Sequence, residues 1–105
     1  MSKDKYLDEV KRIVLDEIDT GSIAVFLFGG RARGSTHRGS DVDIGLLDDK
    51  FIDRKILTAI KVALEESIVP YRCDVVDFFS VDSVFKKVAL EKIEVWNCPK
   101  HINIV

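Results

Sequence analysis

The chain has 105 residues, of which 47% are hydrophobic and 32% charged, a composition typical of one globular domain. Sixteen basic and eighteen acidic residues give a formal net charge of -2, so neither nucleic acid nor an anionic membrane is expected to attract the chain as a whole. No apolar run approaches the roughly 20 residues of a membrane span, and the first ten residues lack the apolar core of a secretory signal. The two cysteines, Cys73 and Cys98, form no disulfide framework, so a cytoplasmic protein is predicted.

The pattern of apolar residues predicts alternating helices and strands in the order α-β-β-α-β-α, followed by a short edge strand. Apolar residues spaced by three and four indicate helices, and short apolar runs bounded by glycine or proline indicate strands. This order predicts an α+β fold, a small mixed sheet with helices packed on one side, in a single domain covering residues 1–105. The expected elements are a helix capped by Ser2 and ending by Gly21, strands at 23–29 and 41–47, a helix at 53–66 capped by Asp53, a strand at 72–78, a helix capped by Ser80, and an edge strand at 93–96.

Three aspartates lie within predicted strands. Asp41 and Asp43 are two residues apart, so the alternation of a strand points them to one face. If the strand at 72–78 is a neighbour of this one, Asp74 completes a triangle with them. Three oxygen donors on adjacent strands suit Mg²⁺, which binds through a few carboxylates together with phosphate and water. The alternative is that these aspartates lie at strand ends as solvated side chains.

A glycine pair, Gly29-Gly30, ends the first predicted strand and opens a polar loop. Adjacent glycines allow a positive φ and let a ligand approach the backbone N–H groups closely. Arg31 and Arg33 follow, and their guanidinium groups could bind phosphate. A glycine pair alone is also compatible with a plain turn that carries solvated arginines.

Together, Gly29-Gly30-Arg31-Ala32-Arg33-Gly34, Ser40-Asp41-Val42-Asp43 and Asp74-Val75-Val76 closely resemble the motifs of the minimal nucleotidyltransferases of the polymerase-β superfamily. That family's pattern is Gly-Ser, a short spacer and Ser-Asp-x-Asp, then a lone Asp on a later strand. The resemblance extends from Ile23 to Trp96 and implies the nucleotidyltransferase fold.

The resemblance also implies a reaction and roles for particular residues. An acceptor hydroxyl would attack the α-phosphorus of a nucleoside triphosphate, with ATP as the expected donor, and pyrophosphate would leave. Two Mg²⁺ ions are expected. The implied metal ligands and catalytic residues are Asp41, Asp43 and Asp74, and the implied nucleotide-binding residues are Gly29, Gly30, Arg31, Arg33 and Ser40.

One departure from the family pattern leaves two functional hypotheses, an enzyme and a binding protein. Gly30 stands where the family has serine, so a hydroxyl that would bond a phosphate is missing, and weakened activity is expected. The first hypothesis is an enzyme whose acceptor is brought by a second chain. The second is a binding subunit with a vestigial site, the antitoxin of a small helical partner of the HEPN type. The resemblance leaves a homo-oligomer open.

Two further expectations concern residues outside these motifs. Asp77 lies three residues after Asp74, so it should point to the opposite face and serve as a turn or capping residue. Cys98 and His101 have side chains that can bind metals, but neither has a companion at metal-ligand spacing in the sequence.

Overall fold

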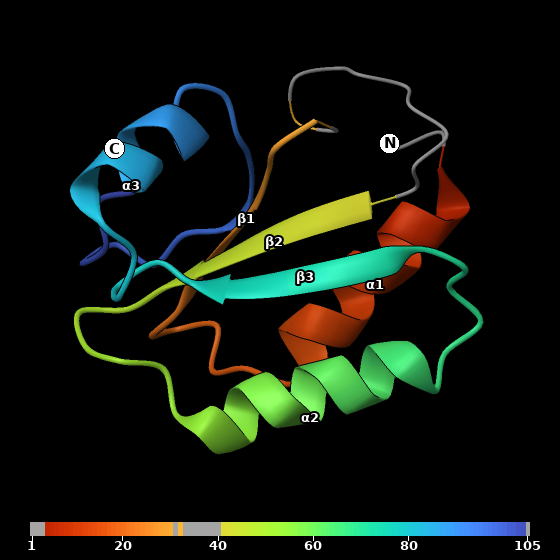
Figure 1. Ribbon diagram of the computed structural model, residues 1–105. Coiled ribbons are helices and arrows are strands. Elements are labelled where there is room, and N and C mark those ends of the chain that lie inside the picture. The colour runs from red at the N-terminus through yellow and green to blue at the C-terminus, as the bar shows by residue number, and fades with distance from the viewer. Residues whose placement is uncertain (1–3, 31, 33–40, 105) are drawn as a thin grey trace.

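The computed structural model describes residues 4–30, 32 and 41–104 (Figure 1). Within these residues the strands form one mixed sheet in the order β3-β2-β1-β4. Strand β2 pairs in parallel with β3 and antiparallel with β1, and β1 pairs antiparallel with β4. The predicted α+β fold with a mixed sheet is thus confirmed. The elements are α1 (Lys5–Asp16), β1 (Ala24–Phe28), β2 (Asp41–Leu47), α2 (Arg54–Glu65), β3 (Arg72–Asp77), α3 (Ser83–Ala89) and β4 (Glu94–Asn97).

The ends of α1 differ from the prediction. Asp4, and not Ser2, is the N-cap, because its carboxylate accepts hydrogen bonds from the backbone N–H groups of Tyr6 and Leu7. The helix ends at Asp16, well before Gly21. A carboxylate that accepts two backbone N–H groups therefore fixes the start of α1 two residues later than expected.

The caps of the other two helices give one confirmed prediction and one error. Asp53 caps α2 as predicted, accepting from the N–H of Lys55. Ser80 does not cap α3, because its hydroxyl donates instead to the carbonyl of Asp77 in the preceding turn. Asp82 is the N-cap and accepts from the N–H groups of Val84 and Phe85.

The sheet has an apolar cluster on each face. On one face, β2 residues Val42, Ile44 and Leu46 pack with α1 and α2, and this helix-side cluster also contains Val10 and Ile60. Because side chains alternate along a strand, Asp41 and Asp43 must point to the opposite face, as predicted.

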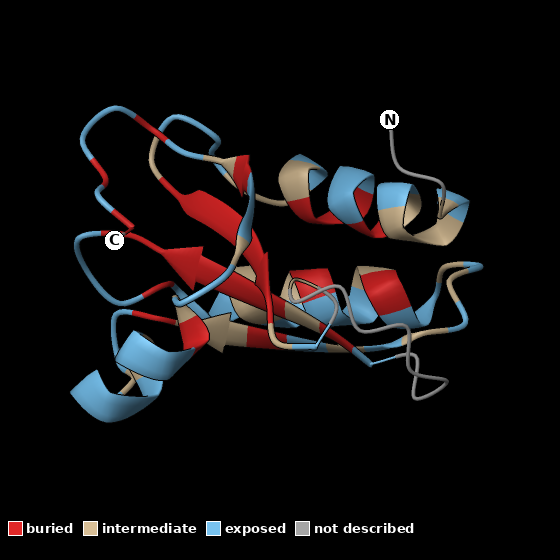
Figure 2. Ribbon diagram, turned by 90° about the horizontal axis from the view of Figure 1, so that it is seen from above, coloured by how far each residue is buried: buried red, intermediate tan, exposed pale blue. Residues whose placement is uncertain are grey.

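The opposite face carries an aromatic cluster built on Phe26, Phe28 and Phe78. Ala89 at the end of α3 and the C-terminal residues Ile102 and Ile104 cover it. Helices α1 and α2 therefore share one face of the sheet, whereas α3 lies on the other (Figure 1). The predicted packing of helices on one side thus holds for α1 and α2 but not for α3. Figure 2 shows β1 buried along its length between these layers. No described helix combines the length and the apolar character that crossing a membrane would require.

Candidate active site

The carboxylates of β2 and β3 meet because these two strands are neighbours. In the parallel register Asp43 is the partner of Asp74, and Asp41 is the partner of Arg72. Partners in a parallel ladder point to the same face, so Asp43 and Asp74 lie side by side on the face away from α1 and α2. The predicted adjacency of the two strands is confirmed, and with it the parity of Asp74.

The electrostatics of Asp43 reflect this concentration of negative charge. Partial burial raises the pKa of the Asp43 carboxyl above its usual range, and the negative charges of Asp74 and Asp41 raise that pKa further. Asp41 and Asp74 are exposed, so water solvates them directly. A cation near Asp43 would remove the repulsion that raises its pKa.

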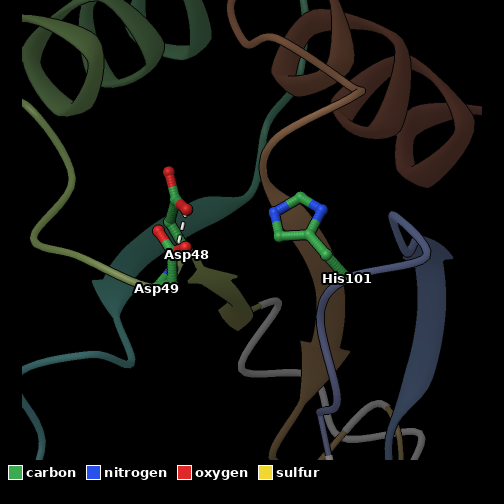
Figure 3. Close-up of side chains that lie close together, drawn as sticks. All are labelled: Asp48, Asp49 and His101. Atoms are coloured by element: carbon green, nitrogen blue, oxygen red, sulfur yellow. Dashed lines mark hydrogen bonds between the residues drawn. The ribbon is translucent and has the colours of Figure 1, made fainter.

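The three carboxylates do not converge tightly in this structure. Among the described residues, a different group of three side chains is close enough to hold a metal ion. It consists of Asp48, Asp49 and His101, whose ligand atoms all lie within 4.8 Å of one another (Figure 3). The ligand atoms of Asp41, Asp43 and Asp74 are not all within that distance of one another. Their hard oxygen donors and shared face nevertheless fit Mg²⁺, which takes few carboxylates and completes its octahedron with phosphate and water.

The glycine turn lies directly against Asp43. Phe28, the last residue of β1, is the antiparallel partner of Asp43, so Gly29 begins the turn beside this carboxylate. Gly29 has φ +75°, a conformation that favours glycine, and a Cβ at this position would overlap Oδ2 of Asp43. Gly29 is therefore needed both for the turn and for the close approach of the backbone to the carboxylate.

Several predicted nucleotide-binding residues fall outside the described part of the chain. Arg31, Arg33 and Ser40 lie there, in the segment between β1 and β2. Gly29 and Gly30 are described, and Gly30 is exposed. Of the predicted nucleotide site, the structure thus describes the glycine pair that begins the loop.

Asp77 has the structural role expected of it. Its Oδ2 accepts from the backbone N–H of Ile52 at 3.0 Å, and its Oδ1 accepts from the N–H of Phe79 at 3.0 Å. These bonds join the end of β3 to the segment before α2. Asp77 is therefore a turn residue, although it lies only three positions from Asp74.

The group around His101 was missed by sequence reasoning. His101 was expected to have no companions at metal-ligand spacing, yet the fold brings it beside Asp48 and Asp49 (Figure 3). These residues are more than fifty positions apart in the chain. Only the tertiary path of the C-terminal segment unites them, so no local spacing could have revealed the group.

Comparisons with known proteins agree with this geometry. The profile of the family described as "Nucleotidyltransferase domain" matches residues 4–100. A probable protein adenylyltransferase, MntA, of Haemophilus influenzae is 28% identical over 64 residues, which cover 61% of this chain and 56% of that protein. The chain thus matches little more than half of that relative's length.

Solved structures show the same fold at low sequence identity. A chain of a variant MntA–HpeT toxin–antitoxin superposes with a TM-score of 0.68 at 20% identity, covering 90% of this chain and 74% of that one. A chain of the complex between the tri-AMPylated HEPN toxin of Shewanella oneidensis and its MNT antitoxin gives a TM-score of 0.64 at 18% identity, covering 92% and 72%. A toxin–antitoxin with AMP-PNP gives 0.62 at 21% identity, covering 95% and 77%.

Proposed function

Because the chain belongs to the nucleotidyltransferase domain family, we propose that it transfers a nucleoside monophosphate, AMP from ATP, to a hydroxyl acceptor on or brought by a partner protein. The observation that carries the proposal is the register that sets Asp43 beside Asp74 on one face, with the Gly29 turn against Asp43. This arrangement supports a phosphate-binding turn beside a cation-binding pair of carboxylates.

The carboxylates are the cation-binding part of the proposed site. Asp41, Asp43 and Asp74 would hold Mg²⁺, and two ions suit a reaction at phosphorus. When bound, Mg²⁺ neutralises phosphate charge and orients the triphosphate. The raised pKa of Asp43 supports this assignment, because partial burial and the nearby charges of Asp74 and Asp41 together disfavour its ionised form, and a bound cation would offset both effects.

The glycine turn is the phosphate-binding part. Backbone N–H groups at Gly29 and Gly30 would bind the phosphates, with Arg31 and Arg33 adding charge and Ser40 supporting the turn. The acceptor hydroxyl oxygen then attacks the α-phosphorus, and the bond from that phosphorus to pyrophosphate breaks. The hydroxyl proton is released and pyrophosphate leaves. The protein contributes mainly by positioning both reactants.

A small helical partner of the HEPN type is the proposed source of the acceptor. The relatives support this choice, since one is named a probable protein adenylyltransferase and another was solved with an AMPylated HEPN toxin. A second candidate function is a binding antitoxin with a weakened site. The glycine at position 30, where the family has serine, favours that candidate.

Transfer of label from ATP tests the proposal. The chain is mixed with a HEPN-type protein and ATP labelled at the α-phosphate, with Mg²⁺ or with excess chelator. We expect label on the partner and an equal amount of pyrophosphate, both only with Mg²⁺. A stable complex that forms without label or pyrophosphate would favour the binding antitoxin, and equal ATP affinity in chelator would contradict the metal assignment.

A further inference from the structure

Three side chains that can bind metals converge beyond the end of β2. Asp48 and Asp49 follow this strand directly, and His101 lies in the C-terminal segment after β4. One ligand atom from each lies within 4.8 Å of the other two (Figure 3). The imidazole and the two carboxylates thus come from distant parts of the chain and surround one small volume.

The Asp48 carboxylate is unusual in its surroundings. Asp48 is only 7% exposed, and among the described residues it is the charged residue that is buried. Its hydrogen-bond partner is the backbone N–H of Asp49, which donates to Oδ1 at 2.7 Å. Oδ2 receives no hydrogen bond from any described residue, and no described Lys or Arg forms an ion pair with Asp48. No described side-chain oxygen is both fully enclosed and unbonded, so Oδ2 is open to solvent although the residue is nine-tenths buried. A bound cation would take the place of that solvent beside the carboxylate.

The imidazole ring of His101 is also without a bonding partner among the described residues. Within the described residues its ring makes neither a hydrogen bond nor an ion pair, although two carboxylates lie within 4.8 Å of a ring nitrogen. The separation is too large for direct bonding and leaves room for an ion between the three groups. A metal ion with bonds of roughly 2.0–2.2 Å to nitrogen and oxygen draws such ligands together.

We propose that Asp48, Asp49 and His101 bind a divalent transition-metal ion of the zinc class, separate from the proposed Mg²⁺ site. An imidazole ligand favours Zn²⁺ and its neighbours over Mg²⁺, which prefers oxygen donors alone. Three protein ligands leave a fourth tetrahedral position for water. A cation bound here would balance the charge of Asp48, which forms no ion pair with a described Lys or Arg.

The position of the site indicates what the metal does. Ile102 and Ile104, next to His101, are buried against the aromatic cluster, and the N–H of Ile102 donates to the carbonyl of Pro99 at 3.1 Å. A metal held by His101 and the two aspartates fastens this C-terminal segment to the end of β2. Asp43 lies five residues before Asp48, about 16 Å along the strand at roughly 3.3 Å per residue, so one ion cannot bind both carboxylates.

Zn²⁺ titration by calorimetry tests the site. Zn²⁺ could also bind the other carboxylates, so the titration uses the intact chain carrying Asp43→Asn and Asp74→Asn. In this background we expect one Zn²⁺ per chain. His101→Gln or Asp49→Asn should weaken binding at least about tenfold, because even residues that only support metal ligands contribute that much.

Two controls make the result decisive. The chain has one other histidine, His37, so His37→Gln should leave Zn²⁺ affinity unchanged. His101 and Asp49 are exposed, so their variants should keep the far-ultraviolet circular dichroism of the parent. In wild-type protein, Zn²⁺ should also slow hydrogen exchange at Ile102. The proposal is wrong if the background variant binds no Zn²⁺, if His101→Gln binds it equally well, or if His37→Gln abolishes binding.

Discussion

The two ends of β2 carry acidic residues in opposite arrangements. At the start of the strand, Asp41 and Asp43 belong to a sequence motif, and Asp74 lies beside Asp43 on β3. The ligand atoms of these three carboxylates are nevertheless not all within 4.8 Å of one another. Beyond the end of the strand, Asp48 and Asp49 belong to no motif, yet they lie within 4.8 Å of His101.

The difference follows from where the backbone is regular. On adjacent strands the pleat and the register fix the spacing of side chains, so Asp43 and Asp74 are separated as strand neighbours are. Where the chain leaves the strand, no ladder fixes the spacing, and the packing of Ile102 and Ile104 brings His101 to the aspartates. A sequence motif therefore predicts side chains that the sheet holds at a fixed spacing, whereas the closer grouping depends on the tertiary path of the C-terminal segment.

The largest effect should come from Asp74→Asn, which tests whether catalysis belongs to the start of β2. We expect at least a hundredfold loss of Mg²⁺-dependent pyrophosphate release. The reason is that the variant lacks one of the carboxylates proposed to hold the Mg²⁺ ions that stabilise charge at the reacting phosphate. Asp77→Asn is the matched control on the same strand. It should keep activity and lower the free energy of unfolding by about 1 kcal/mol, because its carboxylate accepts two backbone N–H groups. The reverse result would mean that Asp77 is the third ligand.

A smaller effect, on the stability of the fold, is expected from Gly29→Ala, which tests how closely the turn packs against Asp43. The added Cβ would meet Oδ2 of Asp43 at a φ of +75°, so the free energy of unfolding should fall by about 2 kcal/mol. Urea denaturation measures this loss. Gly21→Ala is the control, since its Cβ would meet only Oδ1 of Asp19 at 3.3 Å. A loss for Gly29→Ala no larger than that for Gly21→Ala would show that the turn after β1 tolerates a side chain.

Gly30→Ser tests whether the glycine turn at the start of the loop binds phosphates, because this variant is expected to gain activity. If the turn binds phosphates through its backbone, a hydroxyl at this position should raise ATP affinity or nucleotidyl transfer about tenfold, the value of one hydrogen bond to a charged group. Calorimetry with Mg²⁺ and ATP measures the affinity. An unchanged or reduced affinity would indicate a turn rebuilt around glycine.

The smallest effect concerns the raised pKa of Asp43. A carboxyl whose pKa is higher in the folded than in the unfolded state stabilises the fold when protonated, and this contribution is lost as the pH rises through the folded pKa. In chelator at pH 7, Asp43→Asn should therefore be slightly more stable than wild type, by less than about 1 kcal/mol because solvent screens a partly buried group. The gain should disappear below the unfolded pKa near 3.8. A variant that is less stable at pH 7 would show that Asp43 is compensated within the protein.

Much of the fold could be predicted from the sequence because local patterns determine it. The apolar alternation of Val42, Ile44 and Leu46 defined both β2 and the face on which Asp41 and Asp43 lie. Helix ends were less predictable, because several polar residues can compete for the same backbone N–H groups. Asp4 and Asp82 cap their helices where Ser2 and Ser80 were expected, and Ser80 is engaged in a turn with Asp77.

The candidate sites divide in the same way. Asp43 and Asp74 were found because strand parity is a local property and only the adjacency of β2 and β3 had to be assumed. The grouping of His101 with Asp48 was not predictable, because it depends on the tertiary path of residues after β4. The closeness of Gly29 to Oδ2 of Asp43 likewise required the register of β1 with β2.

The order of the strands has a consequence for the spacing of two of the carboxylates. Asp43 lies on an inner strand, with β1 on one side and β3 on the other, whereas Asp74 lies on β3 at the edge of the described sheet. A small shift of the edge strand therefore changes the separation of Asp43 and Asp74 without disturbing the register of Phe28 with Asp43. In the proposed site, the distance between these two cation ligands would thus be adjustable from one side of the sheet only.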